Sequence, residues 1–425
     1  MRPRFRNHEV IRVHMRSTVE EYAAVIIGGG PAGLFCAAHA ASEGLSVLLL
    51  EKMPSCGRKL LITGSGQCNL THEGNIREFL TKYGDHGPFL RMALRAFPPG
   101  DLMAWFSARG LPLETDGSGK IFPASRKASD VLAVLIRECG DRGVEIRCGA
   151  TVREVMRDAG GFCIRSDRGE YRAPSLVIAT GGCSYPRTGS TGDGFARARA
   201  LGHTITPPRP ALTPVYVEGY PFSDLAGVSF PHLTFTLLRD GRKLRAASGD
   251  LLFTHTGLSG PGILHISRTV LPGDLLQVSF LPAMSADVLK RDLATRTAAS
   301  GQQTVKRILA GYPLPARFLS RIADIAGIPP GITGAHLTRN DRDQIVRLLT
   351  AFPFRVARLG GWNEAMVTSG GICLDEINPK TMESRRVRGL YGIGEVLDID
   401  GDTGGYNLQA AFSTAMAAAR ALCGR

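Results

Sequence analysis

Three glycines and one glutamate, spaced as a nucleotide-binding turn requires, are the residues of this chain with the clearest chemistry. Gly28, Gly30 and Gly33 follow one another in the order G-x-G-x-x-G, and Glu51 comes about 20 residues later. Gly28 permits a tight turn, Gly30 lets the backbone approach a pyrophosphate, and Gly33 lets a helix pack closely on a strand. The carboxylate of Glu51 can accept hydrogen bonds from both hydroxyls of a ribose. This spacing predicts a dinucleotide site.

The sequence on both sides of the glycines predicts the strands and the helix that position these residues. The apolar run Ala23–Ile27 predicts a buried parallel strand, and a helix is expected to begin near Pro31. The free N–H groups and positive dipole end of that helix would face the phosphates. A second apolar run, Val47–Leu50, ends at Glu51. A G-x-G-x-x-G sequence alone is weak, but strand, turn, helix, strand and acid in this order indicate a Rossmann-type unit.

A second glycine loop follows closely behind the acid. In Leu60–Thr71 the small residues 63–66 leave backbone N–H groups free to hold a phosphate or the edge of a ring. Arg58 and Lys59 precede the loop with positive charge. A surface loop can have the same composition, but the position beside the dinucleotide turn favours closure over the same ligand.

The middle of the first half continues the alternation of helices and strands. Ser129–Asp141 predicts an amphipathic helix with Ser129 as its N-cap, followed by a short strand over Val144–Arg147. Two further runs, Thr151–Met156 and Phe162–Ser166, alternate as the strands of a β-meander do.

A further buried strand is expected at Leu176–Gly181, whose carboxyl end would lie at the ligand crevice of a doubly wound sheet. The loop Gly189–Gly194, GSTGDG, opens a helix that ends near Gly202. No strand–turn–helix–strand unit with a trailing acid surrounds this loop. A second independent dinucleotide domain is therefore not expected.

The C-terminal region carries a second ligand-facing pattern. Leu390–Gly394 predicts a buried strand, Glu395 follows directly, and the glycine-rich VLDIDGDTGG leads to a helix over Asn407–Leu422. The acid can bind a ribityl hydroxyl, and the helix N-terminus can stabilise negative charge at the N1–C2 carbonyl edge of a flavin. A plain helix cap is the simpler interpretation. A second loop so far along the chain nevertheless fits FAD better than NAD, because FAD spans two such regions.

Between these patterns the composition changes from about Pro207 onward. The proline-rich PPRPALTPVYVEG precedes short β-like runs, including the hairpin-like LTFTLLRDGRKL, up to Phe253–Leu264. Residues 286 to about 351 predict helices broken by proline and glycine, and Trp362–Met366 returns toward strand. We expect a disordered extension at 1–20, the first part of an FAD-binding domain at 21–205, an inserted substrate-side domain at 206–365, and the second part at 366–425.

Length and composition exclude several classes of protein. The 425 residues are 44% hydrophobic, enough for two or more domains with buried cores, and no apolar run approaches a membrane span of about 18 residues. The segment MRPRFRNHEVIRVHMRS has five arginines and no apolar core like that of a signal peptide, with Met15 as an alternative to Met1 as the start. We expect a cytoplasmic protein without membrane contact.

The net charge of +13 is carried mostly by arginine. A basic surface can attract nucleic acid, but an enzyme that handles an anionic cofactor and anionic substrates also tends to be basic. The basic residues are scattered, with no patch interleaved with aromatic residues. The sequence therefore favours a small-molecule substrate over nucleic acid.

The nine cysteines form no C-x-x-C pair, which argues against a zinc site and against a redox disulfide facing a flavin. We expect no metal and reduced thiols, most of them buried. The cysteines are Cys36, Cys56, Cys68, Cys139, Cys148, Cys163, Cys183, Cys373 and Cys423.

No catalytic residue is assigned from the sequence. His255, in a Gly/Ser-rich turn, is a candidate proton donor, but a structural histidine is favoured. Tyr406 could line a flavin or a pocket, or pack in the core. Cys68 and Cys183 fit close backbone approach better than a nucleophile's role, and Arg187 fits a solvated surface better than an anion site.

Four motifs carry a resemblance to a known family: VIIGGGPAGL, GRKLLITGSGQCNLT, FTHTGLSGP and GLYGIGEVLDIDGDTGGYNLQAAFSTA. Nearly all of the chain after residue 21 resembles the BaiN/RdsA family of NAD(P)/FAD-dependent oxidoreductases, which includes aminoacetone-oxidase-like flavoproteins. The second and fourth motifs are highly specific, whereas most flavoproteins share the first. The resemblance implies an α/β fold, with a Rossmann-like FAD-binding domain of the two-dinucleotide-domain flavoprotein type. An inserted β-barrel-like plus helical domain would interrupt it.

The resemblance also implies FAD contacts at ten positions: Ala32, Glu51, Arg58, Lys59, Gly66, Gln67, Val152, Glu395, Asn407 and Leu408. Many members read G-G-G-R-C-N where this chain has Gly64–Asn69, so the neutral Gln67 replaces a guanidinium while the backbone cradle is kept. With the residues reasoned above, the expected cofactor-binding set is Gly28, Gly30, Ala32, Gly33, Glu51, Lys52, Arg58, Lys59, Thr63, Gly64, Gly66, Gln67, Cys68, Asn69, Val152, Thr180, Gly181, Gly394, Glu395, Asn407 and Leu408.

The chemistry so implied is hydride transfer at flavin N5 with a small organic substrate. Only one complete dinucleotide unit is present, at Val25–Glu51, so NAD(P)H is expected as a transient electron donor rather than a resident cofactor. The alternatives are an oxygen-dependent amine or alcohol oxidase, a flavin-dependent RNA-modifying enzyme, and a non-catalytic flavin redox module. The oligomeric state is left open.

Overall fold

The computed structural model describes residues 19–424. The extension expected at residues 1–20 and the choice between Met1 and Met15 therefore lie almost entirely outside the described residues. Glu20 is within them and begins β1 (Glu20–Glu21), which pairs in parallel with β10 at Tyr171 and Arg172.

A five-stranded parallel sheet forms the centre of the larger domain, in the order β20-β11-β2-β3-β7. The short apolar runs of the sequence become its strands because they are buried on both faces. β20 arrives from the far end of the chain and pairs Leu390 with Leu176, so the edge strand of this sheet comes from the C-terminal region. The strands are β2 (Ala24–Ile27), β3 (Val47–Glu51), β7 (Glu145–Cys148), β11 (Ser175–Ile178) and β20 (Leu390–Gly392).

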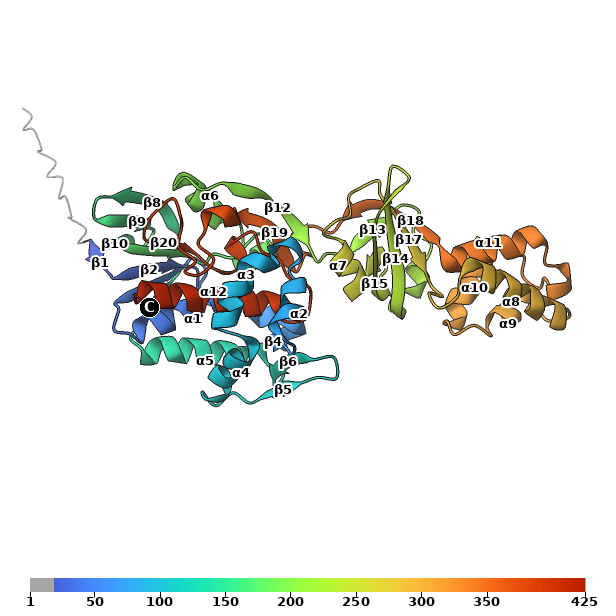
Figure 1. Ribbon diagram of the computed structural model, residues 1–425, viewed down its shortest axis with the longest axis horizontal. Helices are drawn as coiled ribbons and strands as arrows, with labels where there is room; N and C mark the ends of the chain where they lie inside the picture. Colours follow the sequence, from blue (N-terminus) through green and yellow to red (C-terminus); the bar gives the residue numbers. More distant parts are fainter. Residues whose placement is uncertain (1–18, 425) are drawn as a thin grey trace, which may run out of the picture.

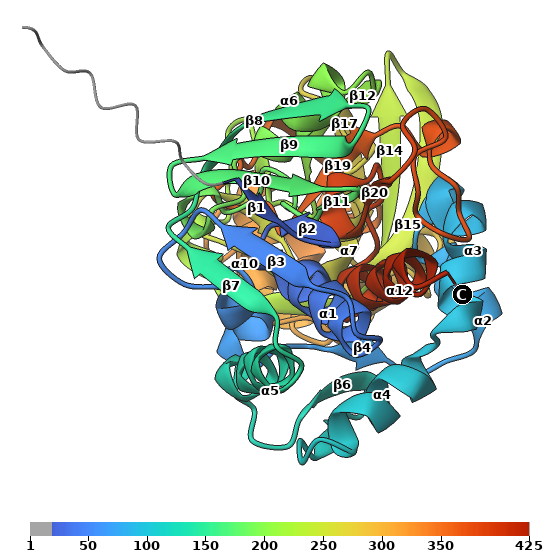
Figure 2. The ribbon, with the colours of Figure 1, turned by 90° about the vertical axis from the view of Figure 1, so that its left-hand side faces the viewer.

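Helices cover one face of this sheet and a second sheet covers the other (Figure 2). The helices are α1 (Pro31–Ala41), α5 (Ala128–Asp141) and α12 (Tyr406–Leu422), and the second sheet contains β1, β8 (Val152–Asp158), β9 (Gly161–Ser166) and β10 (Gly169–Ala173). The expected cap of α5 is wrong by two residues. Lys127 occupies the N-cap position without a side-chain bond, and the hydroxyl of Ser129 instead donates to Asp130.

Smaller elements complete this domain. A three-stranded sheet in the order β4-β6-β5 and four helices surround the central layers. They are β4 (Thr71–His72), β5 (Leu113–Thr115), β6 (Lys120–Pro123), α2 (Ile76–Thr81), α3 (Gly87–Ala96), α4 (Pro99–Ser107) and α6 (Asp193–Ala200).

A two-stranded antiparallel ribbon leads out of this domain and back into it. It pairs β12 (Ile205–Ala211) with β19 (Val367–Ile372). The return strand begins at Val367, five residues after Trp362, so Trp362–Met366 is not part of it. Those residues form a turn, in which the Glu364 carboxylate accepts the Gly361 N–H at 3.1 Å.

Beyond the ribbon lies an inserted barrel with helices at its far end (Figure 1). The closed barrel has the strand order β13-β16-β15-β14-β17-β18. Phe318 of α10 packs on Phe230 and Phe280 of the barrel, so the barrel and the helices share one apolar core. The elements are β13 (Val215–Val217), β14 (Ser229–Arg239), β15 (Arg242–Phe253), β16 (Gly257–Ser259), α7 (Pro261–Ile266), β17 (Leu275–Ser279), α8 (Ala286–Ala299), α9 (Val305–Leu309), α10 (Ala316–Ile325), α11 (Arg339–Thr350) and β18 (Phe352–Leu359).

This architecture confirms the predicted fold class, a Rossmann-like FAD-binding domain interrupted by a β-barrel and helices. The domain boundaries at residues 206 and 365 stay a prediction.

Candidate functional site

A cavity of about 710 Å³ lies at the carboxyl ends of the central strands. Its wall includes the glycine turn after β2, the end of β3, the loop before β4, and the segments that precede α6 and α12. Side chains of the inserted segment complete it. Both the volume and the position at the carboxyl edge of a parallel sheet are typical of nucleotide sites.

The glycine turn has the close contacts that its spacing predicts. Gly28 has a φ of 112°, and a Cβ there would lie 2.4 Å from the carbonyl oxygen of Ala179. A Cβ on Gly33 would lie 2.0 Å from the carbonyl oxygen of Gly28. Gly30 has no atom near its Cβ position, lines the cavity, and caps α1 without a side-chain hydrogen bond. The first N–H groups of α1 are thus available to an anion.

Glu51 ends β3 beside this turn. One carboxylate oxygen accepts the Gly29 N–H at 2.7 Å, and the other accepts the Met53 N–H at 2.7 Å. Burial raises the pKa of the Glu51 carboxyl, and the two N–H bonds oppose that shift. A carboxylate held in this way keeps lone pairs for further donors, as a ribose-binding acid needs.

Lys52, next along the chain, ties the GSTGDG loop to the same wall. Its ammonium group donates to Thr191 at 2.6 Å and forms an ion pair with Asp193 at 2.7 Å. Asp193 begins α6 and lines the cavity. The glycine loop before α6 is thereby part of the site, although it carries no dinucleotide unit of its own.

The second loop adopts backbone conformations that L-residues rarely take. Within Leu60–Gly66, two short 3-10 turns are separated by a kink at Thr63–Ser65. Gly64, Ser65 and Cys68 have φ values of 54°, 57° and 59°. Such conformations persist where surrounding structure enforces them and gather at ligand sites. Burial raises the pKa of the Cys68 thiol to about 12, which excludes a thiolate nucleophile near neutral pH.

Glu395 is the centre of a polar network between the two ends of the FAD-binding domain. One carboxylate oxygen accepts the Thr368 N–H at 2.8 Å and the Ser184 hydroxyl at 3.1 Å. The other lies 2.7 Å from the ammonium nitrogen of Lys59, which also donates to Ser184. The acid therefore lines the cavity with its charge balanced by a lysine.

The N-terminus of α12 forms another part of the wall. Gly405 precedes it with a φ of 91°, and a Cβ there would lie 2.4 Å from the carbonyl oxygen of Thr71. The Asn407 amide accepts the Gly401 N–H at 2.7 Å and donates to the Gly401 and Asp402 carbonyls. Asn407 lines the cavity and also braces the loop that enters the helix.

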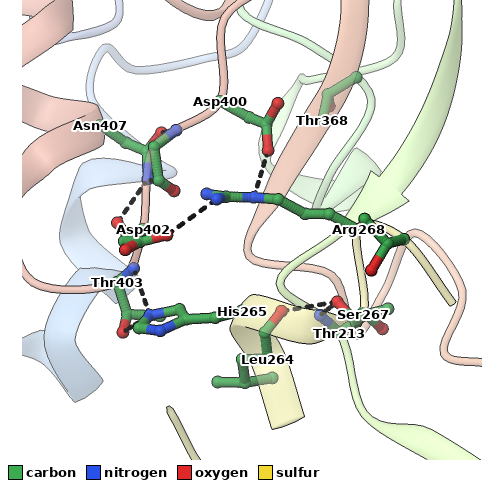
Figure 3. Close-up of polar contacts among 12 residues, drawn as sticks. Thr213, Leu264, His265, Ser267, Arg268, Thr368, Asp400, Asp402, Thr403 and Asn407 are labelled. Carbon is green, nitrogen blue, oxygen red and sulfur yellow. Dashed lines mark hydrogen bonds and ion pairs between the residues drawn. The ribbon is translucent and has the colours of Figure 1, made fainter. Parts of the chain in front are cut away.

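The inserted segment and its connecting ribbon close the cavity with apolar side chains: Leu212, Pro261, Leu264 and Met366. Tyr185 also lines it, with a φ of 53° that is unusual for an aromatic residue. Next to this wall, His265 and Arg268 reach from the inserted segment to the loop of Asp400, Asp402 and Thr403 (Figure 3).

Most of the predicted cofactor residues meet at this one cavity. All residues of the predicted set line the cavity except Gly33, Gly66 and Cys68. For every residue of the set, contact with a cofactor stays a prediction. Gly33 instead packs α1 on the turn, and Cys68 is fully buried.

The remaining candidates lie elsewhere. His255 and Arg187 are exposed and outside the cavity wall, and Tyr406 is buried against Phe79 and His72. Sequence reasoning missed several wall residues, which are Lys120, Phe122, Tyr185, Thr188, Ser190, Asp193, Leu212, Pro261, Leu264, Met366, Thr403 and Gly404. Three motifs noted in the sequence overlap this set: FTHTGLSGP ends at Pro261, GSTGDG contains Ser190 and Asp193, and VLDIDGDTGG contains Thr403 and Gly404.

The residues present fit FAD. Two helix N-termini open on one cavity, and an acid stands at the ribose position of the glycine turn. A side chain at Gly28 would collide with the backbone of Ala179, so the turn needs glycine there. Within residues 19–424, no cluster of three metal-ligating side chains occurs. In the same part of the chain, no helix is both long and apolar enough to cross a membrane.

Fold and cavity together define a Rossmann-type flavoprotein. Residues 22–421 match the HI0933-like protein Rossmann domain, and the chain belongs to that family, which confirms the BaiN/RdsA resemblance. It is an FAD-dependent oxidoreductase.

Two curated relatives align along nearly their whole length. The 3-dehydro-bile acid delta(4,6)-reductase of Clostridium scindens is 34% identical over 409 residues, which cover 94% of this chain and 98% of that protein. The ribosomal RNA dihydrouridine synthase of Escherichia coli is 33% identical over 408 residues, which cover 95% and 98%.

Among solved structures, similarity is confined to the fold. The 3-ketosteroid delta1-dehydrogenase from Sterolibacterium denitrificans aligns with a TM-score of 0.51 at 13% identity, covering 96% of this chain and 100% of that one. A quinol-fumarate reductase aligns with a TM-score of 0.51 at 15% identity, covering 96% and 71%.

Proposed function

We propose that this chain catalyses the reduction of a carbon–carbon double bond conjugated to a carbonyl group, with NAD(P)H as electron donor. The observation that carries the proposal is the continuity of one cavity from the nucleotide turn to the apolar side chains of the inserted segment. A planar, largely apolar acceptor can reach the cofactor there and lie against apolar side chains.

The names of the relatives support the same bond chemistry. A delta(4,6)-reductase and a dihydrouridine synthase both describe addition of two hydrogens to a carbon–carbon double bond. The sequence identity of this chain to the two relatives is nearly equal, so it does not favour the substrate of one over that of the other. The reaction type, which both names share, is therefore better supported than either substrate.

FAD, when bound, supplies hydride transfer at its N5 atom. The residues of the chain bind and orient it. Gly28, Gly30 and the N-terminus of α1 would hold the pyrophosphate, and Glu51 the ribose. The N-terminus of α12 would stabilise negative charge on the ring system. Leu264, which is buried, would present an apolar surface to the substrate.

The substrate that we propose first is a small molecule. A uracil in structured RNA is the second candidate, and the charge of the inserted segment favours it. Residues 206–365 contain 18 lysines and arginines against 11 aspartates and glutamates. An excess of this kind strengthens contact with phosphates, and such binding weakens steeply as salt rises.

One anaerobic experiment tests the proposal. We expect NADH or NADPH to bleach the flavin absorbance, and an α,β-unsaturated ketone or an unmodified ribosomal RNA transcript to restore it with formation of the saturated product. Bleaching by an amine or alcohol, with hydrogen peroxide formed in air, would instead identify an oxidase. Restoration by RNA alone, lost between 50 and 200 mM salt, would select the second substrate.

A further inference from the structure

Arg268 joins the inserted segment to the FAD-binding domain. It follows α7, and its guanidinium lies 2.6 Å from Asp400 and 2.8 Å from Asp402 (Figure 3). Among residues 19–424, this side chain makes both ion pairs that connect residues 206–365 with the rest of the chain. Asp400 is buried, and burial raises the pKa of its carboxyl while the charge of Arg268 opposes that shift.

His265 makes a second link from α7 to the same loop. Its Nε2 atom accepts the Thr403 N–H at 3.2 Å and lies 2.9 Å from the Thr403 hydroxyl. A ring nitrogen that accepts an N–H carries no proton, so this contact requires the neutral ring with its proton on Nδ1.

The loop that these two side chains contact belongs to the cofactor cavity. Ile399, Thr403 and Gly404 line the cavity, and α12 begins two residues after Gly404. On the same side of the loop as α12, Asn407 bonds Gly401 and Asp402, as described above. The Asp402 N–H also donates to the Lys82 carbonyl at 2.9 Å.

On the inserted side, α7 carries the wall that faces the substrate. Pro261 and Leu264 line the cavity, and His265 follows directly in the same helix. One short helix therefore presents apolar side chains to the cavity while it binds the loop at the N-terminus of α12.

We propose that His265 and Arg268 are positioning residues for the reaction. Together with Asp400, Asp402 and Thr403 they form an interdomain clamp that fixes the substrate wall of α7 to the cofactor loop 399–405. The clamp would set the distance between substrate and cofactor, and such distances matter because a misplacement of about 1 Å can cost roughly 100-fold in rate. The effect on rate rests on the proposed function, whereas the clamp itself does not.

Acid should weaken the clamp at His265. Burial lowers the pKa of the His265 ring, and Asp402 opposes that shift while Arg268, Lys82 and Arg245 add to it. Protonation would convert Nε2 from an acceptor into a donor that faces the Thr403 N–H. The clamp should therefore hold with His265 neutral and loosen as pH falls through its lowered pKa.

The first test replaces the arginine in the full-length FAD-loaded protein. We expect Arg268→Gln to increase hydrogen–deuterium exchange in residues 399–405 and to lower kcat about 10- to 100-fold, with a smaller change in KM. Arg268→Lys should recover part of both effects. Arg296→Gln is the control, because Arg296 pairs with Asp292 within α8, in the helices at the far end of the inserted segment and outside the cavity wall.

Asp402→Asn gives the same test with less risk to folding, since the Asp402 side chain is 20% exposed and Asp400 keeps its arginine. The proposal is overturned if exchange in residues 399–405 is unchanged in both folded variants, or if Arg268→Lys is no better than Arg268→Gln.

The second test concerns the histidine. The carboxamide oxygen of His265→Gln can accept the Thr403 N–H without titrating. At neutral pH we expect residues 399–405 of this variant to exchange as they do in the wild type. The increase in exchange that acid causes in the wild type should be lost. An unaltered acid response would overturn the role of His265. If no acceptor supports turnover, the exchange measurements still show whether the clamp holds residues 399–405. A failure of the clamp can therefore be distinguished from a failure of the proposed function.

Discussion

The ammonium nitrogen of Lys59 lies 2.7 Å from the carboxylate of Glu395, although 336 residues separate them in the sequence. Each side chain is 21% exposed and lines the cavity. The pair therefore connects the second glycine loop with the segment that completes the central sheet, at the place where the cofactor is expected to lie.

The Lys59–Glu395 pair should show energetic coupling in FAD binding. Removing Lys59 leaves the Glu395 carboxylate without its counter-charge, so Lys59→Met and Glu395→Gln should each weaken binding. The double variant should lose less than the sum, with a coupling of about 0.5–3 kcal/mol. Titration of the apoprotein with FAD measures this, and additive losses would show that the two residues act independently.

Glu51 should contribute more to cofactor binding than any single backbone donor. Charge-assisted hydrogen bonds are worth about 1.5–3 kcal/mol each, so Glu51→Ala should weaken FAD binding by roughly one to three orders of magnitude. The carboxylate also accepts the Gly29 and Met53 N–H groups, so the folded state of the variant must be checked by circular dichroism. Full FAD retention in a folded variant would assign the ribose to another residue.

Gly33 should tolerate no side chain. A Cβ there would lie 2.0 Å from the Gly28 carbonyl oxygen, so Gly33→Ala should lower the free energy of unfolding by roughly 1–3 kcal/mol or more and push α1 from the turn. Gly140→Ala in α5 is the control, because its Cβ position is open and alanine favours a helix by about 0.5–1 kcal/mol. Thermal unfolding should shift in opposite directions for the two variants.

Acid should destabilise the protein through His39. Burial lowers the pKa of His39 to about 4, from 6.5 in the unfolded chain. Between these values the unfolded state binds a proton that the folded state does not, so stability is fully present above pH 6.5 and falls toward pH 4 by about 3 kcal/mol.

The matched variant for this prediction is His39→Asn, whose amide N–H can still donate to the Phe35 carbonyl as Nδ1 does. Urea unfolding across this pH window should show a shallower slope in the variant. An identical slope would attribute the acid loss to other groups.

Electron donor and acceptor should use the cavity in turn. Val25–Glu51 is the one complete dinucleotide unit in the sequence, so NAD(P)H would enter the same cleft as the acceptor and leave before it binds. Steady-state rates should therefore give parallel double-reciprocal lines, as ping-pong kinetics require. Intersecting lines would indicate two separate sites.

The sequence by itself determined the local parts of this protein. The buried strands at Ala24–Ile27 and Val47–Glu51, the helix at Pro31 and the turn of Gly28 follow from apolar runs and glycine spacing, because these signals act over neighbouring residues. The same local logic placed Glu51 and Glu395 directly after strands. It was less accurate at Ser129, where the N-cap lies two residues earlier at Lys127, and at Trp362–Met366, where a local Gly361–Glu364 bond holds a turn instead of a strand.

Only the tertiary structure decided which distant residues meet. It paired Leu390 with Leu176 and Lys59 with Glu395, and it brought Tyr185 and Leu264 to one cavity wall. Nothing in the residues around Arg268 indicates that Asp400 and Asp402 will face it. Such contacts depend on how the inserted barrel returns to the FAD-binding domain. That geometry is set by how whole layers of the structure pack together. Packing between distant segments leaves no periodic pattern in the sequence from which it could be predicted.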